Sequence, residues 1–322
     1  MKNFFLVLLL VLTQLNSNAW GFYAHRRINY YAVFLLPPEM LLLYKSHIGF
    51  LEEHAVDPDK RRYAVNEEGP RHYIDLDRYG SYPYDSLPRS WSKALQKYGD
   101  SLQTHGIVPW WLQTMLHRLT NAFREKNLSR ILKYSAEIGH YISDAHVPLH
   151  ASSNHNGQYT GQKGIHGFWE SRIPELLAET TPGWDFLLGR AAYLKDPGSF
   201  FWSRVLESAA AADTVLRVEK QLSYAFPGDR RYAFEERNGV IIRQYSAAYT
   251  MAYNERLHGM VERRMRQSIY AVASCWFTAW VNAGQPRLDS LMTDSLSPEE
   301  RTELEELNRA WRNNPIKGRE HD

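Results

Sequence analysis

Apolar residues recur at helical spacing through much of this 322-residue chain, and this pattern limits its fold more than any other feature. Runs that alternate polar and apolar residues, as a half-buried strand requires, are scarce. Proline follows two of the expected helices and cannot continue their backbone hydrogen-bond ladder. The segments expected to be helical are 22–36, 110–123, 129–147 (capped by Ser129), 200–222, 234–282 (one helix or two) and a charged helix that starts at Ser297. The sequence therefore predicts an all-α fold.

Three regions are expected along the chain. Residues 1–19 contain Lys2, an apolar run from Phe4 to Leu12 and a small-residue end at Ala19, a pattern typical of a cleaved secretory signal peptide. The apolar run is too short to span a bilayer, so we expect no stable membrane anchor. Residues 20–290 are interpreted as one domain, and residues 291–322 as a solvated terminal helix and tail. We expect an exported protein, periplasmic or secreted, whose mature chain begins at Trp20.

The composition argues against some classes of binding partner. The formal net charge is +2 and falls to about +1 when Lys2 leaves with the signal peptide, so no basic surface for duplex nucleic acid or an anionic membrane is indicated. This balance does not exclude a small phosphate-bearing substrate held by metal. Cys275 is the single cysteine, so no internal disulfide can stabilise the exported chain. Metal ions are the remaining way to cross-link it, and no protein partner is inferred.

Histidines and carboxylates recur four residues apart in the middle of the chain. His140 and Asp144 lie on an expected helix, where this spacing places both on one face, so they can bind one metal together. His150 follows just after a proline and can present a second imidazole to a neighbouring site. His166 and Glu170 repeat the four-residue separation. The spacing therefore predicts two metal sites in this region.

The loops 52–84 and 151–164 are long for a helical domain, which favours a functional role for both. Asp57 precedes His72 by fifteen residues in the first loop, and the two could complete the first metal site. Asp59 is the main alternative to Asp57, and the fifteen-residue step favours Asp57. Mixed imidazole and carboxylate ligands suit zinc, whereas calcium or magnesium would call for oxygen alone. Manganese and iron are the less favoured alternatives.

Together these motifs resemble those of the bacterial zinc-dependent phospholipases C and the fungal single-strand-specific zinc nucleases, which share one fold. The resemblance covers residues 20–170 by motif: an initial Trp with a following His, a loop Asp and His, a His-x-x-x-Asp-x-x-x-x-x-His run and a closing His-x-x-x-Glu. It implies a single multi-helix domain of that type. The matching positions are Trp20, His25, Asp57, His72, His140, Asp144, His150, His166 and Glu170.

The resemblance implies three Zn²⁺ ions. The first would be bound by Asp57, His72, His140 and Asp144, and the second by His150, His166 and Glu170. The third would be bound by the α-amine and carbonyl of Trp20, with His25 and a shared Asp144. A free α-amine titrates at about pH 7.7–8.0 and binds metal only when deprotonated, so a metal captures it readily at neutral pH. Cleavage of the signal peptide should therefore precede activity.

The same resemblance implies hydrolysis of a phosphodiester. Zinc acidifies a bound water, and Asp57 is the ligand that could double as general base. Glu170, the sixteen residues from His150 to His166 and the lack of paired cysteines look like the phospholipase C branch. The step from Trp20 to His25 and the run 72–75 look like the nuclease branch. The substrate is thus expected to be a phospholipid headgroup, narrowly ahead of single-stranded nucleic acid.

Several alternatives remain open at this point. A non-catalytic zinc-binding protein would have closed sites and no need of a bare N-terminal Trp. His146 and His155 are secondary candidates for a ligand and a substrate contact. Aromatic residues near the ligands could stack a base or line a headgroup pocket, although such residues are more often core: Tyr73, Phe168 and Trp169. The histidines interpreted as structural or exposed are His47, His54, His105, His117, His258 and His321.

Overall fold

The structure is a computed structural model that describes residues 21–180, 188–237, 239–291, 298–317 and 319. The expected signal peptide, the expected mature N-terminus at Trp20 and the expected cap Ser297 lie outside the described residues. Among the described residues, no helix combines the length and the apolar character needed to cross a bilayer.

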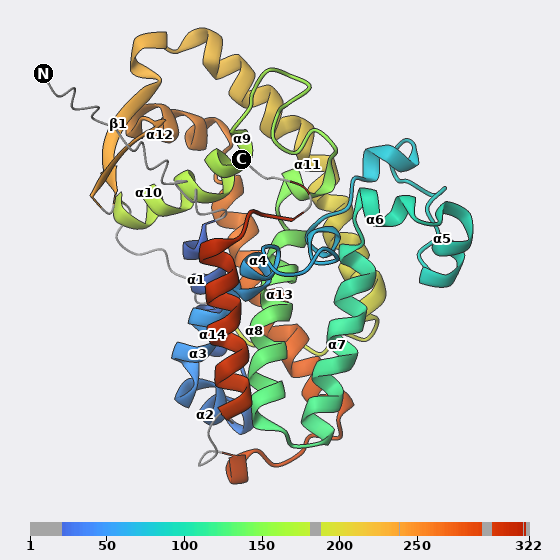
Figure 1. Cartoon of the computed structure of the whole chain (residues 1–322). Coiled ribbons are helices and arrows are strands. Elements are labelled where there is room, and N and C mark those ends of the chain that lie inside the picture. Colours follow the sequence, from blue (N-terminus) through green and yellow to red (C-terminus); the bar gives the residue numbers. More distant parts are fainter. Residues whose placement is uncertain (1–20, 181–187, 238, 292–297, 318, 320–322) are drawn as a thin grey trace, which may run out of the picture.

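The described residues are mostly helical with one small two-stranded sheet, which agrees with the predicted all-α class (Figure 1). The α-helices are α1 (Phe22–Val33), α2 (Pro38–Ser46), α3 (Ile48–Glu53), α4 (Asp57–Arg61), α5 (Trp91–Tyr98), α6 (Ser101–His105), α7 (Val108–Arg124), α8 (Leu128–Ala145), α9 (Ile165–Gly167), α10 (Ile173–Thr180), α11 (Pro197–Ala225), α12 (Ala247–Arg256), α13 (Met260–Asn282) and α14 (Pro298–Asn313). Short turns separate them: η1 (His54–Val56), η2 (Gly69–His72), η3 (Leu76–Tyr79), η4 (Pro148–Ala151), η5 (Phe168–Arg172, a π-helical turn), η6 (Gly228–Arg230) and η7 (Asp289–Leu291).

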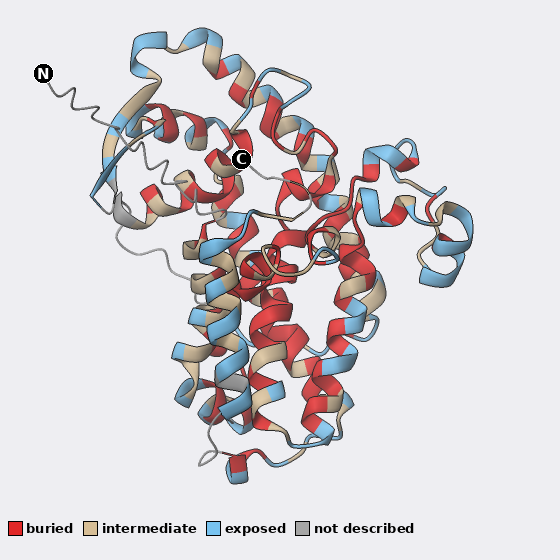
Figure 2. Ribbon diagram, in the orientation of Figure 1, coloured by how far each residue is buried: buried red, intermediate tan, exposed pale blue. Residues whose placement is uncertain are grey.

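Helix α8 is the centre of the molecule and carries two candidate ligands. Its N-cap is Asn127, whose side chain accepts from the Arg130 backbone N–H at 3.0 Å, so the expected cap at Ser129 is wrong by two residues. Every residue from 135 to 145 is buried, because α1, α7 and α13 pack around it (Figure 2). A helix that is covered on all sides holds its side chains in place on every face.

A glycine lets α1 approach α8 closely. A Cβ on Gly139 would lie 1.9 Å from Asn29 Oδ1, so a larger residue cannot occupy this position without movement. The amide of Asn29 donates to the carbonyls of Leu51 and Ala136, both at 3.1 Å. This contact brings His25, one turn before Asn29, close to His140, which follows the glycine.

The expected helix at 234–282 begins later than predicted. Residues 232–245 form an antiparallel hairpin of β1 (Tyr232–Arg237) and β2 (Val240–Tyr245), and helix resumes at Ala247. The sequence carried a signal for this turn, because the pair Asn238-Gly239 is typical of two-residue hairpin turns. A second break, at Gly259 with φ of 71°, separates α12 from α13.

The terminal helix is not the solvated appendage expected from its charge. α14 packs against α4 and runs along the helical body beside α3 and α8 (Figure 1). Trp311 lies with its ring centroid 5.4 Å from that of Phe22 in α1, and Lys60 Nζ lies 5.8 Å from the Trp311 centroid. One face of α14 is therefore part of the fold, while its charged face is solvated.

Candidate metal centre

The structure gathers the predicted histidines and carboxylates into three adjoining groups. Within each group the potential ligand atoms lie within 4.8 Å of one another, so each could hold a metal ion. None of these residues is more than 9% exposed. The groups are His25, His140 and Asp144; Asp59, His72 and His140; and His150, His166 and Glu170. Trp20, expected beside His25, lies outside the described residues.

The side chains around His72 lie close enough together to hold one ion. His72 Nδ1 lies 3.0 Å from both His140 Nε2 and Asp144 Oδ2, and the last two atoms are 3.2 Å apart. Asp59 Oδ1 lies 3.8 Å from His72 Nδ1 and 3.7 Å from His140 Nε2. A tetrahedral ion with bonds of 2.0–2.2 Å separates its ligand atoms by about 3.3–3.6 Å. The five distances, from 3.0 to 3.8 Å, lie on both sides of this range, so the four side chains surround one point at roughly tetrahedral spacing without its regular geometry.

The carboxylate in this group is that of Asp59 and not that of Asp57, which corrects the preference drawn from the fifteen-residue step. Both residues lie on α4, where residues two apart point to nearly opposite sides. Asp57 points to His54 Nδ1, 2.6 Å from Oδ2, and to Lys60 Nζ, 3.0 Å from Oδ1. Burial would raise the pKa of Asp57, but His54 and Lys60 outweigh burial and lower it. A carboxylate held in this way is poorly suited to the base role expected of it.

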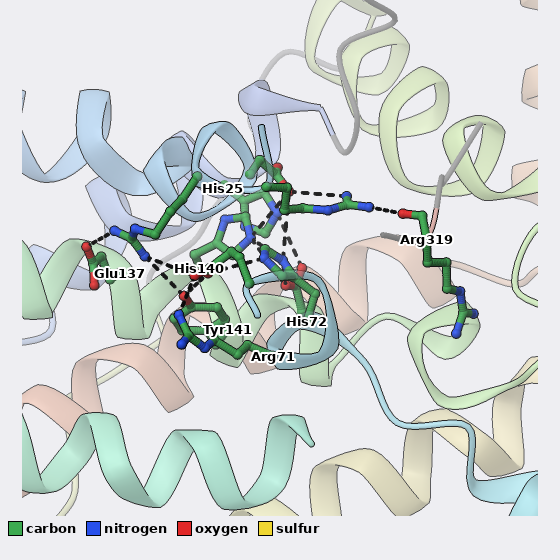
Figure 3. Close-up of polar contacts among 12 residues, drawn as sticks. His25, Arg71, His72, Glu137, His140, Tyr141 and Arg319 are labelled. Carbon is green, nitrogen blue, oxygen red and sulfur yellow. Dashed lines mark hydrogen bonds and ion pairs between the residues drawn. The ribbon is translucent and has the colours of Figure 1, made fainter. Parts of the chain in front are cut away.

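Asp144 joins the three groups. Its Oδ2 belongs to the His72 group, while its Oδ1 lies 3.5 Å from His25 Nε2 and 3.9 Å from His150 Nε2. Figure 3 shows the rings of His25, His72 and His140 gathered at this point. A carboxylate shared between sites, as expected for Asp144, must occupy such a central position.

The third group depends on the loop 151–164, for which we expected a functional role. His166 Nε2 lies 3.1 Å from Glu170 Oε1, and His150 Nε2 lies 3.3 Å from Glu170 Oε2. The amide oxygen of Asn156 accepts from the backbone N–H groups of Gly164 and His166, which fixes the end of the loop beside η5. π-Helical turns such as η5 occur often at functional sites.

Three imidazoles are oriented by backbone carbonyls. Nδ1 of His140 lies 2.9 Å from the Ala55 carbonyl, Nδ1 of His150 lies 2.7 Å from the His72 carbonyl, and Nδ1 of His166 lies 3.2 Å from the His155 carbonyl. A carbonyl can only accept, so each Nδ1 carries the proton. Nε2 of each ring faces the carboxylates, where it would turn its lone pair to a bound ion. Metal-binding histidines have this second contact in most proteins.

The buried carboxylates of the cluster are ionised and need positive charge beside them. Burial opposes ionisation of Asp144, yet His140 and His150 outweigh it and hold the pKa of Asp144 well below its usual value. Burial would lower the pKa of His140, but Asp144 and Asp59 raise it to about 9. Burial likewise opposes ionisation of Glu170, and His166 and His150 lower its pKa to about 2. Buried carboxylates of this kind are stabilised by protonated imidazole or by a bound cation.

Two residues beside the groups were missed in the sequence. Glu68 is fully buried; its Oε1 lies 3.5 Å from His72 Nε2, and it accepts from Tyr141 and Arg71. It can orient His72 from behind, as second carboxylates do at zinc sites. Arg62, 2% exposed, places Nη1 3.9 Å from Asp59 Oδ1. The basic run 60–62 after Asp59 was the available signal for the arginine.

Neither secondary candidate histidine belongs to one of the three groups. His146 donates from Nδ1 to the Ile142 carbonyl, and burial with Arg264 lowers its pKa to about 3, so it belongs to no group. His155 contributes its carbonyl to His166. The ring centroid of Phe168 lies 3.8 Å from that of Tyr245, and Trp169 is fully buried. Both are core residues, the commoner of the two roles considered for them from the sequence.

No protein-family model matches the chain, and no curated protein matches it significantly.

Proposed function

We propose that this protein is a zinc-dependent phosphodiester hydrolase with the fold of the zinc phospholipases C and single-strand-specific nucleases. One observation carries the proposal: three imidazoles, each tied at Nδ1 to a carbonyl, direct Nε2 at buried carboxylates in adjoining groups. In the proposed ligand set, Asp59 replaces Asp57, and the other described ligands remain as expected from the sequence. Three zinc ions are proposed, the third completed by the amine of Trp20.

The donors fit zinc. Imidazole nitrogen mixed with carboxylate oxygen is a set that zinc prefers. Asp59 Oδ1 lies at ligand distance, and its Oδ2 is buried with no hydrogen-bond partner among the described residues, so the carboxylate can bind an ion through one oxygen and keep the other free. The group of His150, His166 and Glu170 has three protein donors. Closed structural zinc sites have four, so three donors favour catalysis over storage.

The chain's own residues supply positioning and charge. Bound zinc ions would act as Lewis acids on phosphate oxygens and would acidify the attacking water. We assign the role of general base to Asp59, because its Oδ2 lacks a hydrogen-bond partner whereas Asp57 is held by His54 and Lys60. Arg62 keeps a permanent charge beside Asp59 and favours negative charge on a phosphate at the cluster.

Phospholipid headgroups are the favoured substrate and single-stranded nucleic acid is the alternative. Glu170 as the closing carboxylate, and a chain without paired cysteines, support the phospholipase C branch. His25, whose Nε2 lies 3.5 Å from Asp144 Oδ1, is five residues after Trp20, the step that resembles the nuclease branch. A non-catalytic zinc-binding protein is the rival from another class.

A paired assay tests the proposal. The purified mature chain is loaded with zinc and given phosphatidylcholine vesicles, single-stranded DNA and bis(p-nitrophenyl) phosphate, each with and without chelator. We expect chelator-sensitive release of diacylglycerol and of nitrophenol. Release of nucleotides alone would select the nuclease alternative. Three bound zinc ions with no hydrolysis of any substrate between mildly acidic and neutral pH would favour the storage protein and end the proposal.

A further inference from the structure

The described residues after α14 form a strap over the segment that carries Asp59 and His72. We define this C-terminal strap as residues 314–317 and 319. The backbone N–H of Lys317 donates to the Arg62 carbonyl at 2.8 Å, and its Nζ donates to the Ala64 carbonyl at 2.9 Å. Asn314 donates from Nδ2 to the Tyr63 carbonyl at 3.2 Å. The strap therefore follows the chain directly after α4.

Arg319 joins two loops that carry ligands of different groups. Its Nη1 donates to Asp75 Oδ1 at 2.6 Å, and its Nη2 donates to the Ser152 carbonyl at 3.1 Å. Its guanidinium also lies over the Tyr73 ring, 4.1 Å from the centroid. Tyr73 and Asp75 follow His72, and Ser152 follows His150. Figure 3 shows Arg319 beside the cluster.

These two loops are already paired at the ligands themselves. His150 donates from Nδ1 to the His72 carbonyl at 2.7 Å, and the N–H of Ile74 donates to the His150 carbonyl at 2.9 Å. Ser153 also donates from its backbone N–H and its hydroxyl to Asp77, at 3.0 and 2.7 Å. The fork of Arg319 adds a charged connection to this pairing. The carbonyl of Arg319 in turn accepts from the guanidinium of Arg62, the arginine beside Asp59.

We propose that Arg319 is a positioning residue that holds the loops of His72 and His150 in the geometry needed for metal binding, and that its carbonyl fixes the guanidinium of Arg62 beside Asp59. This inference rests on the proposed function, because it concerns the same cluster. Arg319 acts through its neighbours, since its hydrogen bonds and its ring contact within the described residues are to Asp75, Ser152, Arg62 and Tyr73 and not to a candidate ligand. Its ion pair with Asp75 is mostly buried, with side chains 14% and 8% exposed, so screening by water is weak.

Zinc affinity is the measurement that a merely structural role would not change. The full mature chain is compared as wild type, Arg319→Ala, Arg319→Lys and Arg312→Ala, the last being an exposed arginine at the end of α14. Competition with a chromogenic chelator measures zinc affinity, and thermal unfolding of the metal-free chain checks the fold. We expect Arg319→Ala to weaken zinc binding about tenfold, as loss of an outer contact typically does.

Arg319→Lys should be intermediate, because it keeps the charge but cannot donate to both Asp75 and Ser152 from a fork. Asp75→Asn supplies an independent variant if Arg319→Ala does not fold, and the double variant should lose no more affinity than Arg319→Ala alone. With bis(p-nitrophenyl) phosphate, we expect kcat to fall and KM to change little.

Two results would overturn the inference. One is zinc affinity in Arg319→Ala equal to that of Arg312→Ala. The other is a rise in activity, which would identify the strap as a barrier to substrate. Failure of the wild-type chain to hydrolyse any phosphodiester while it binds zinc would end the proposed function, and the affinity comparison would still decide the role of Arg319.

Discussion

Two aspartates on one short helix have opposite surroundings, and this difference can be tested at the scale of the residue. Asp59 faces His72 and His140, whereas Asp57 is neutralised by His54 and Lys60. We expect Asp59→Asn to lower the zinc content by one ion per chain after dialysis, because a neutral amide is a weaker ligand than a carboxylate. Asp57→Asn should keep all the zinc of the wild type, measured by atomic emission. Loss of zinc from Asp57→Asn alone would restore the assignment made from the sequence.

The contact of Gly139 with Asn29 makes a second prediction at this scale. The added Cβ of Gly139→Ala would lie 1.9 Å from Asn29 Oδ1, so α1 and α8 must move apart. We expect a loss of about 1–3 kcal/mol in the free energy of unfolding, or more, measured by urea denaturation. Gly49→Ala in α3 is the matched control, because nothing lies within 4 Å of its Cβ. It should be neutral or stabilising by about 1 kcal/mol or less, since alanine is the better helix former. Equal changes in the free energy of unfolding for Gly139→Ala and Gly49→Ala would contradict the close approach of α1 to α8.

At the scale of the element, α14 shows that a charged helix can have a structural face. Trp311 packs between Phe22 of α1 and Lys60 of α4. We expect Trp311→Ala to lower the free energy of unfolding by about 1–2 kcal/mol, because a half-buried indole loses part of its contact area. Tyr224→Ala, at a side chain 79% exposed, should change it little in the same urea titration. If Trp311→Ala lowered the free energy of unfolding no more than Tyr224→Ala does, α14 would not pack against the body in solution.

At the scale of the whole molecule, metal binding and folding should be linked. The candidate ligands come from α1, α4, α8 and the segments around η2, η4 and η5, so bound ions would connect elements that are far apart in the chain. We expect chelation to lower the midpoint of thermal unfolding, because each ion that binds the folded state contributes about 4 kcal/mol when its free concentration is a thousand times its dissociation constant. Calorimetry with and without chelator measures this. Zinc should restore the midpoint and magnesium should not. An unchanged midpoint would contradict tight binding by the folded state.

The features that could be predicted from the sequence depend on the spacing of residues close together in the chain. Helical periodicity indicated the fold class, and the four-residue steps from His140 to Asp144 and from His166 to Glu170 placed each pair together, because side chains four apart on a helical turn share a face. The hairpin at 232–245 was within reach too, since its Asn-Gly pair is a local signal. Such features depend on a few neighbouring residues and need no knowledge of packing.

The tertiary structure decided the rest. The choice between Asp57 and Asp59 depended on which side of α4 faces His140 of α8. The roles of Glu68, Arg62 and Arg319 depended on long-range contacts, such as Tyr141 with Glu68 across 73 positions and Arg62 with Arg319 across 257. The packing of α14 against α4 likewise depended on the tertiary position of the last helix. The sequence by itself determined the ligand types and their local pairs. Packing alone could bring pairs from distant segments to one point, because no short-range pattern records which faces of two helices will meet.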